Sequence, residues 1–152
     1  MSVSSTDRIE KEILLQAPVA RVWRALTDAG EFGTWFRVAL DGPFVAGQRL
    51  VGRITHPGYE HVTMELLVER MDAETLFSYR WHPYAVDPAV DYSQEPTTLV
   101  EFRLSPKGGG TLLSVVESGF DRVPAHRRDE AFRMNERGWA GLLKNIERHV
   151  AG

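Results

Sequence analysis

The sequence predicts an α+β fold in which a curved antiparallel sheet wraps around one long C-terminal helix and encloses an apolar cavity. Six strand-like segments follow one another between residues 36 and 118, and tight turns join most of them, which favours antiparallel pairing. A helical pattern with a proline at its start then covers residues 124–150. A single long helix of this kind has to cover the apolar face of the sheet.

The N-terminal part of the chain contributes one strand and two short helices. Polar and apolar residues alternate over residues 8–15, the pattern of a strand. Pro18 suits the first turn of a helix, and Val19, Val22, Trp23 and Leu26 follow at helical spacing. Residues 28–30 are expected to end this helix, and residues 31–35 form a second helical piece.

The middle of the chain reads as strands, an irregular loop and a hairpin. Residues 83–96 contain three prolines and little periodicity, so they are expected to form a long exposed loop that acts as a lid or as a dimer interface. Three glycines at 108–110 mark a hairpin turn. The expected strands cover residues 36–40, 48–55, 59–71, 75–82, 97–105 and 111–118, and the apolar stripe of the last helix comprises Phe132, Trp139, Leu142, Leu143, Ile146 and Val150.

Length and composition fit one domain over residues 1–152 and exclude several functions. The net charge of −3 provides no field that attracts nucleic acid or anionic lipid. The absence of cysteine excludes disulfides, thiol nucleophiles and thiolate metal sites. No apolar run is long enough to span a bilayer, and the N-terminus lacks the pattern of a secretory signal. We therefore expect a cytoplasmic protein without membrane insertion.

Candidate site residues follow from the alternation of side chains along the strands. Phe77, Tyr79 and Trp81 share one face of their strand, and an inward-facing Leu113 and Val115 would bring Glu117 inward as well. The predicted ligand-binding residues are Trp35, Phe36, Met64, Phe77, Tyr79, Trp81, Val100, Phe102, Glu117, Arg128, Phe132, Asn135 and Trp139.

Glu117 is the most informative of these residues, and two interpretations stay open. A carboxylate on an apolar concave wall would be desolvated, which raises its pKa and suits it to proton transfer or to holding a polar ligand group. Alternatively, Glu117 lies at a strand end and pairs with an arginine or caps the following loop. Arg128 and Asn135 either orient a ligand from the long helix or reach water at its edge.

Motifs for metals, cofactors and covalent catalysis are absent from the sequence. The five histidines show no i, i+4 pair with a carboxylate companion. There is no nucleophile elbow, phosphate-binding glycine loop or dinucleotide fingerprint. We therefore predict no metal and no cofactor, and the catalytic residues stay unassigned.

Four ordered stretches resemble a known family. They are residues 17–28 (APVARVWRALTD), Trp35-Phe36, residues 117–120 (ESGF), and Gly138-Trp139 followed by Leu142 and Leu143. Together with the order of elements, they resemble the START-like (SRPBCC, helix-grip) superfamily, and within it the family named for the activator of the heat-shock protein ninety ATPase. The resemblance implies the helix-grip fold. It also implies a range of functions, since superfamily members bind lipids, sterols or polyketides, some catalyse cyclisation, and the co-chaperones act on a large ATPase.

The residues and the resemblance therefore leave three functions open. The first is binding of an apolar or aromatic small molecule, lipid-like or polyketide-like, between the long helix and the sheet. The second is a cyclase-type enzyme in which Glu117 or His82 is the general base and Arg128 its electrostatic partner. The third is a co-chaperone-like domain that binds a chaperone partner, which is the least favoured. Expected partners are a small apolar ligand and a second copy of the chain, and no nucleic acid.

Overall fold

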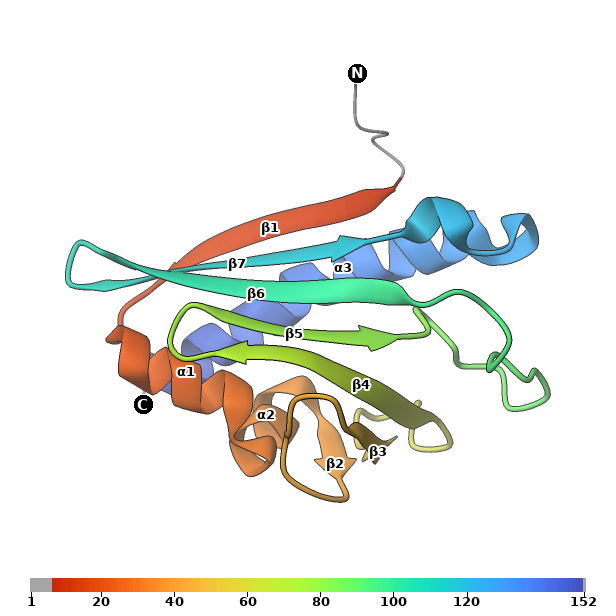
Figure 1. Ribbon diagram of the computed structural model, residues 1–152, viewed down its shortest axis with the longest axis horizontal. Coiled ribbons are helices and arrows are strands. Elements are labelled where there is room, and N and C mark those ends of the chain that lie inside the picture. The colour runs from red at the N-terminus through yellow and green to blue at the C-terminus, as the bar shows by residue number, and fades with distance from the viewer. Residues whose placement is uncertain (1–6, 152) are drawn as a thin grey trace.

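The computed structural model describes residues 7–151, which form one curved sheet and three α-helices (Figure 1). Residues 1–6, where no secretory signal was expected, lie outside the described part. No helix within residues 7–151 is both long and apolar enough to cross a membrane. The elements in chain order are β1 (Arg8–Leu15), α1 (Val19–Thr27), α2 (Ala29–Phe36), β2 (Val38–Leu40), β3 (Arg49–Ile54), β4 (Thr63–Asp72), β5 (Leu76–Trp81), β6 (Thr98–Lys107), β7 (Gly110–Ser118), the short 3-10 helix η1 (Phe120–Arg122) and α3 (Ala125–Ala151).

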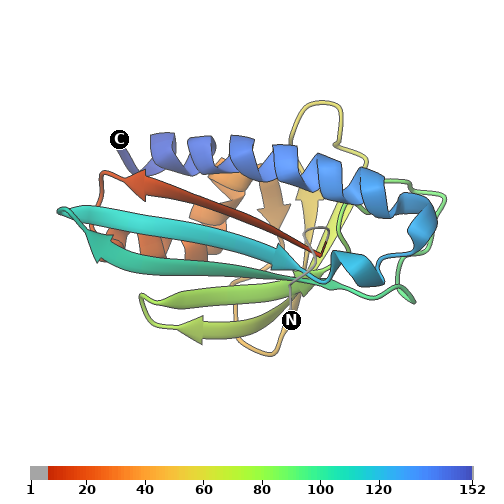
Figure 2. The same cartoon turned by 90° about the horizontal axis from the view of Figure 1, so that it is seen from above.

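The sheet and the long helix confirm the predicted fold class. The strands lie in the order β1-β7-β6-β5-β4-β3-β2, and every neighbouring pair is antiparallel. Helix α3 lies along one face of the sheet (Figure 2). It buries Trp139, Leu143, Ile146 and Val150 of the predicted stripe, and the Trp139 ring packs edge-on against Phe102 of β6, with 5.6 Å between ring centroids. The core therefore lies between α3 and the sheet.

One aspartate separates the first two helices and corrects their predicted bounds. We expected residues 28–30 to be a break, whereas α2 already begins at Ala29. The Asp28 N–H donates to the Arg24 carbonyl at 2.9 Å and ends α1. The Asp28 Oδ1 then accepts from the Glu31 N–H at 3.0 Å and caps α2. Because the same residue serves both helix ends, no further residues are needed between them.

Two predicted strands begin later than expected because local turns occupy their first residues. Helix α2 continues through Phe36, and Arg37 ends it in the left-handed region at φ 68°, so β2 lacks both residues. Before β4, the Tyr59 N–H donates to the His56 carbonyl and the Val62 N–H donates to the Tyr59 carbonyl. These bonds form two consecutive turns, so pairing of β4 starts after them. Helix η1 was not predicted.

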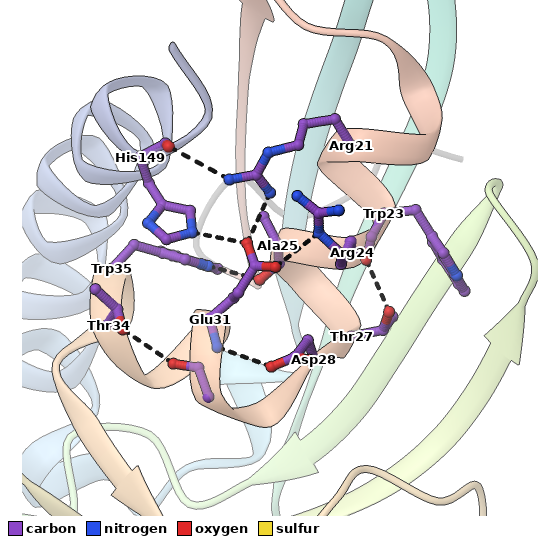
Figure 3. Close-up of polar contacts among 11 residues, drawn as sticks. Arg21, Trp23, Arg24, Ala25, Thr27, Asp28, Glu31, Thr34, Trp35 and His149 are labelled. Atoms are coloured by element: carbon purple, nitrogen blue, oxygen red, sulfur yellow. Dashed lines mark hydrogen bonds and ion pairs between the residues drawn. The ribbon is translucent and has the colours of Figure 1, made fainter. Parts of the chain in front are cut away.

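A polar cluster holds the C-terminal end of α3 against α1 and α2 (Figure 3). Glu31 accepts from Arg21 Nη1 at 2.7 Å and from Arg24 Nε at 2.8 Å, and His149 Nε2 lies 2.9 Å from Glu31 Oε1. Burial acts to raise the pKa of Glu31, but the bonds from His149, Arg21 and Arg24 outweigh it and hold the pKa at about 2. This cluster fixes the position of α3 relative to the two short helices.

Candidate ligand-binding site

A cavity of about 1000 Å³ lies beside the N-terminal half of α3. Its walls come from the end of α2, from α3, from β3 and β4 and the turn that joins them, from the end of β5, and from the segment that follows β5. Figure 2 shows this segment close to the N-terminal half of α3. The lining residues are Phe36, Arg49, Ile54, Tyr59, Val62, Thr63, Met64, Glu65, Trp81, His82, Tyr84, Ala85, Val86, Asp91, Tyr92, Ser93, Glu95, Pro96, Thr97, Met134, Asn135 and Gly138.

Arg127 of α3 binds the 83–96 loop, which lines this cavity. Its Nε and Nη2 lie 2.8 and 2.7 Å from Glu95 Oε1, and its Nη1 donates to the Pro83 carbonyl at 2.7 Å. The guanidinium also lies 4.7 Å from the centre of the Tyr92 ring, a cation–π contact. Both side chains of the ion pair are largely buried. The loop therefore forms a wall of the cavity that one arginine holds in place.

The floor of the cavity covers a buried carboxylate. Glu117 of β7 is fully buried, and its Oε2 accepts from Trp81 Nε1 at 2.7 Å and from Thr98 Oγ1 at 2.5 Å. Its Oε1 accepts from Trp139 Nε1 at 2.8 Å, and Asn135 Nδ2 lies 2.9 Å from Oε1 and 3.2 Å from Oε2. Trp81 and Asn135 line the cavity, whereas Glu117 does not. The carboxylate therefore does not contact the cavity directly, but it binds two of the side chains that line it.

Strand register and helix spacing bring these donors together. Trp81 pairs with Thr98 across β5 and β6, and Val100, two residues further along β6, pairs with Glu117. Thr98 and Val100 share one face because side chains alternate along a strand. Asn135 lies four residues before Trp139, so both project from the same side of α3. Donors from three elements, β5, β6 and α3, thus converge on one carboxylate of β7.

Burial raises the pKa of Glu117, and the hydrogen bonds from Thr98, Trp139, Trp81 and Asn135 act in the opposite direction. No cation contacts the carboxylate within residues 7–151. A buried carboxylate without a cation is tolerated only when donors satisfy its oxygens, and here four side chains supply them. This arrangement excludes the alternative in which Glu117 pairs with an arginine or caps the following loop.

Tyr79 lies close to the same carboxylate. Its side chain is fully buried, and its hydroxyl has no hydrogen-bond partner in the described part of the chain. Burial, together with the nearby charge of Glu117, raises the pKa of Tyr79 well above its usual value. The phenol therefore stays protonated and extends the aromatic core beneath the floor.

The predicted ligand-binding residues fall into three groups. Phe36, Met64, Trp81 and Asn135 line the cavity. Two lie away from it, since Arg128 Nε donates to the Val123 carbonyl at 3.0 Å and the Phe132 ring packs on Phe120 at 5.2 Å. The remaining seven are buried in the core between α3 and the sheet, and these are Trp35, Phe77, Tyr79, Val100, Phe102, Glu117 and Trp139.

Much of the cavity wall was not predicted. Ile54, Tyr59, Val62, Met134 and Gly138 line it, as does most of the 83–96 loop. One signal was available in the sequence. Tyr84, Val86 and Tyr92 are large apolar or aromatic residues in a loop that was expected to be exposed, and such residues favour a loop that packs against the protein.

The polar groups of the cavity show no metal-binding arrangement. Among residues 7–151, no three histidine, aspartate or glutamate side chains gather closely enough to hold a metal ion. His82 lines the cavity, and its Nε2 lies 3.0 Å from the Glu95 carbonyl oxygen. The site therefore offers apolar surface, hydrogen-bonding groups, the charged side chains of Arg49, Glu65, Asp91 and Glu95 in its wall, and one buried carboxylate beneath its floor.

Solved structures share this architecture. Protein MLL2253 from Mesorhizobium loti matches with a TM-score of 0.74 at 22% identity, over 95% of this chain and 96% of that chain. DynU16, a putative protein in the dynemicin biosynthetic locus, matches with a TM-score of 0.73 at 20% identity, over 95% of this chain and 47% of that chain. The Aha1 dimer from Colwellia psychrerythraea matches with a TM-score of 0.70 at 15% identity, over 94% and 95%. At these identities the likeness shows the fold.

The family is shown by the sequence itself. No curated protein matches the chain. A family model, by contrast, matches residues 16–151, which include all three α-helices, six of the strands and the whole cavity wall. The chain therefore belongs to the family described as activator of Hsp90 ATPase homolog 1-like protein.

Proposed function

We propose that this protein binds an apolar or aromatic small molecule, lipid-like or polyketide-like, in the cavity beside α3. The observation that carries the proposal is a cavity of about 1000 Å³ whose wall includes Phe36, Met64, Trp81, Tyr84 and Met134. Sites for small organic molecules are typically concave and mostly apolar, with a few polar groups that fix orientation. Aromatic rings and flexible methionines suit a ligand with a flat or irregular apolar skeleton.

The position of Glu117 favours binding over cyclase-type catalysis. A general base must lie within hydrogen-bond reach of the proton that it removes. Glu117 is fully buried, and Trp81 and Asn135 lie between it and the cavity. Arg128, its expected electrostatic partner, bonds to Val123 instead. Similarity to DynU16, a putative protein in a biosynthetic locus, supports a natural-product ligand without requiring a reaction.

Two glycines of α3 provide a matched test. Gly138 lines the cavity, and a Cβ added there meets nothing within 4 Å. Gly141 lies on the same helix with equally open space, but outside the cavity wall. Gly138→Phe therefore fills part of the cavity, whereas Gly141→Phe leaves it open. Neither change is expected to harm the helix, because glycine is a poor helix former.

The assay is fluorescence titration with Nile red, a neutral apolar dye. We expect saturable binding by the native protein and by Gly141→Phe, and an affinity at least about tenfold weaker in Gly138→Phe, which corresponds to about 1.4 kcal/mol. Thermal unfolding of both variants checks that the fold is kept. Equal affinity in the two variants would show that the dye binds elsewhere, and no saturable binding to the native protein would refute the proposal.

A further inference from the structure

The amide of Asn135 has only one orientation compatible with its surroundings. Its Nδ2 lies within hydrogen-bond distance of both oxygens of Glu117. Glu117 Oε1 also receives the indole N–H of Trp139, and an indole nitrogen only donates. Oε1 is therefore an acceptor, and a carbonyl oxygen of Asn135 facing it would repel it. The Nδ2 group has to face the carboxylate.

This orientation does not depend on the ionisation of Glu117. When the carboxylate is charged, both oxygens accept. When it is protonated, the proton can be placed on Oε2, where the Thr98 hydroxyl at 2.5 Å is able to accept it. Oε1 remains an acceptor for Trp139 and Asn135 in both states. The buried carboxylate thus acts as a positioning group for the Asn135 amide at every pH at which the protein is folded.

The other end of the same amide is then available to the cavity. Asn135 lines the cavity and is half-buried, and its Oδ1 has no hydrogen-bond partner among residues 7–151. Among residues 7–151, Asn135 Oδ1 is not one of the fully buried polar atoms without a partner. This oxygen is therefore accessible. The floor beside the Trp81 ring therefore presents a fixed acceptor, and the buried carboxyl group of Glu117 lies behind it.

We infer that Asn135 selects ligands that carry a hydrogen-bond donor. The protein then binds a neutral hydroxylated aromatic molecule in preference to a carboxylate such as a fatty acid. A hydroxyl can donate to Asn135 Oδ1 while the attached ring packs on Trp81. A ligand carboxylate has no proton to donate, so its oxygens would face the acceptor oxygen of Asn135 without a hydrogen bond. The guanidinium of Arg49 in the cavity wall is already paired with Glu65, at 2.9 Å. The inference rests on the proposed function, because it assumes that ligands occupy this cavity.

Small naphthalene derivatives test the selection directly. 2-Naphthol carries a donor, 2-methoxynaphthalene keeps the oxygen without its proton, and 2-naphthoate carries a negative charge. Their affinities are measured by displacement of Nile red from the native protein. We expect 2-naphthol to bind about threefold to tenfold more tightly than 2-methoxynaphthalene, the usual net contribution of one hydrogen bond, and 2-naphthoate to bind more weakly than either.

Variants distinguish the effect of the Asn135 amide on ligand preference from the effect of other residues in the cavity wall. In Asn135→Leu the ratio of the 2-methoxynaphthalene Kd to the 2-naphthol Kd should fall by about threefold to tenfold relative to the native protein. In Met134→Leu, which changes the neighbouring wall residue, the ratio should not change. Glu117→Met keeps the length of the side chain but removes both acceptor oxygens, so the Asn135 amide is no longer fixed and the ratio should fall there too.

The outcomes distinguish this inference from the proposed function. If Nile red binds but the native protein shows no preference for 2-naphthol, the selection by Asn135 is wrong and the binding function stands. The selection is equally wrong if the preference survives in Asn135→Leu. If the preference is lost in Asn135→Leu but kept in a folded Glu117→Met, Asn135 selects without Glu117 and the positioning role fails. If neither Nile red nor any naphthalene binds, both proposals fail together.

Discussion

Replacing Glu117 by glutamine changes only one atom of the buried network and removes an acceptor that it needs. In the native protein, Oε2 accepts from Trp81 and Thr98, and Oε1 accepts from Trp139 and Asn135. Glutamine has a single acceptor oxygen, and its amide nitrogen must face one of the two indole N–H groups. An unsatisfied buried donor costs about 1–3 kcal/mol.

The effect depends on pH with a definite sign. Burial raises the pKa of Glu117 in the folded state, so the unfolded chain loses this proton first as the pH rises. The Glu117 contribution to the free energy of unfolding therefore decreases between the unfolded value of 4.5 and the folded pKa. The Glu117→Gln variant has no titrating group at this position, so its free energy of unfolding does not show this decrease. The stability gap between the native protein and Glu117→Gln is thus largest at pH ~4 and below, and it narrows as the pH rises.

Urea denaturation at several pH values measures this gap. Near pH ~4 we expect Glu117→Gln to lose about 1–3 kcal/mol, with an unchanged m-value. For a chain of this length such a loss lowers Tm by roughly 2–12 °C. The control is Glu12→Gln on β1, whose side chain is exposed and which should change stability by less than about 0.5 kcal/mol. A Glu117→Gln variant as stable as this control near pH ~4, or a gap that widens with pH, would rule out this role for the carboxylate.

Two further predictions concern the cluster at Glu31 and the loop over the cavity. Because the folded pKa of Glu31 is about 2, its stabilisation is present above 4.5 and is lost as the pH falls towards 2. Glu31→Gln should therefore cost about 1–2 kcal/mol at neutral pH, after allowance for partial exposure, and should approach the native stability near pH ~2 in urea titrations. A gap that persists at that pH would contradict this pKa. Arg127→Ala removes the cation that pairs with Glu95, so proteolysis within residues 83–96 should accelerate and Nile red should dissociate roughly tenfold faster. Unchanged cleavage and dissociation rates would show that another contact holds the loop.

The sequence predicted an inward direction for several strand residues, and most of these side chains are buried, although Ser78 on the opposite face of β5 is buried too. Alternation along β5 and β7 assigned Phe77, Tyr79 and Glu117 to the inner face, and all three are fully buried. This succeeds because the period of a strand is fixed by its geometry. Alternation does not tell which inward residues contact the core and which contact a cavity. That distinction depends on the path of the 83–96 loop and on its attachment to α3, which periodicity does not encode.

The choice between neighbouring arginines shows a second limit. We expected Arg128 to face the ligand, whereas Arg127 holds the loop and Arg128 bonds to Val123. One residue corresponds to about 100° around a helix, so an error of one residue in the predicted helix phase exchanges their roles. Glu117 shows a third limit, since its donors come from β5, β6 and α3 and meet only in the folded chain. Its inward direction was predictable, but its partners were not.

A ¹H–¹⁵N correlation spectrum recorded while 2-naphthol is added would locate the bound ligand directly. We expect saturable shifts of the Trp81 indole N–H and of the Asn135 side-chain amide, since these groups form the floor above Glu117. The indole of Trp23, which does not line the cavity, should stay unchanged. Saturable shifts confined to other residues, with Trp81 and Asn135 unmoved, would contradict a ligand site at this floor.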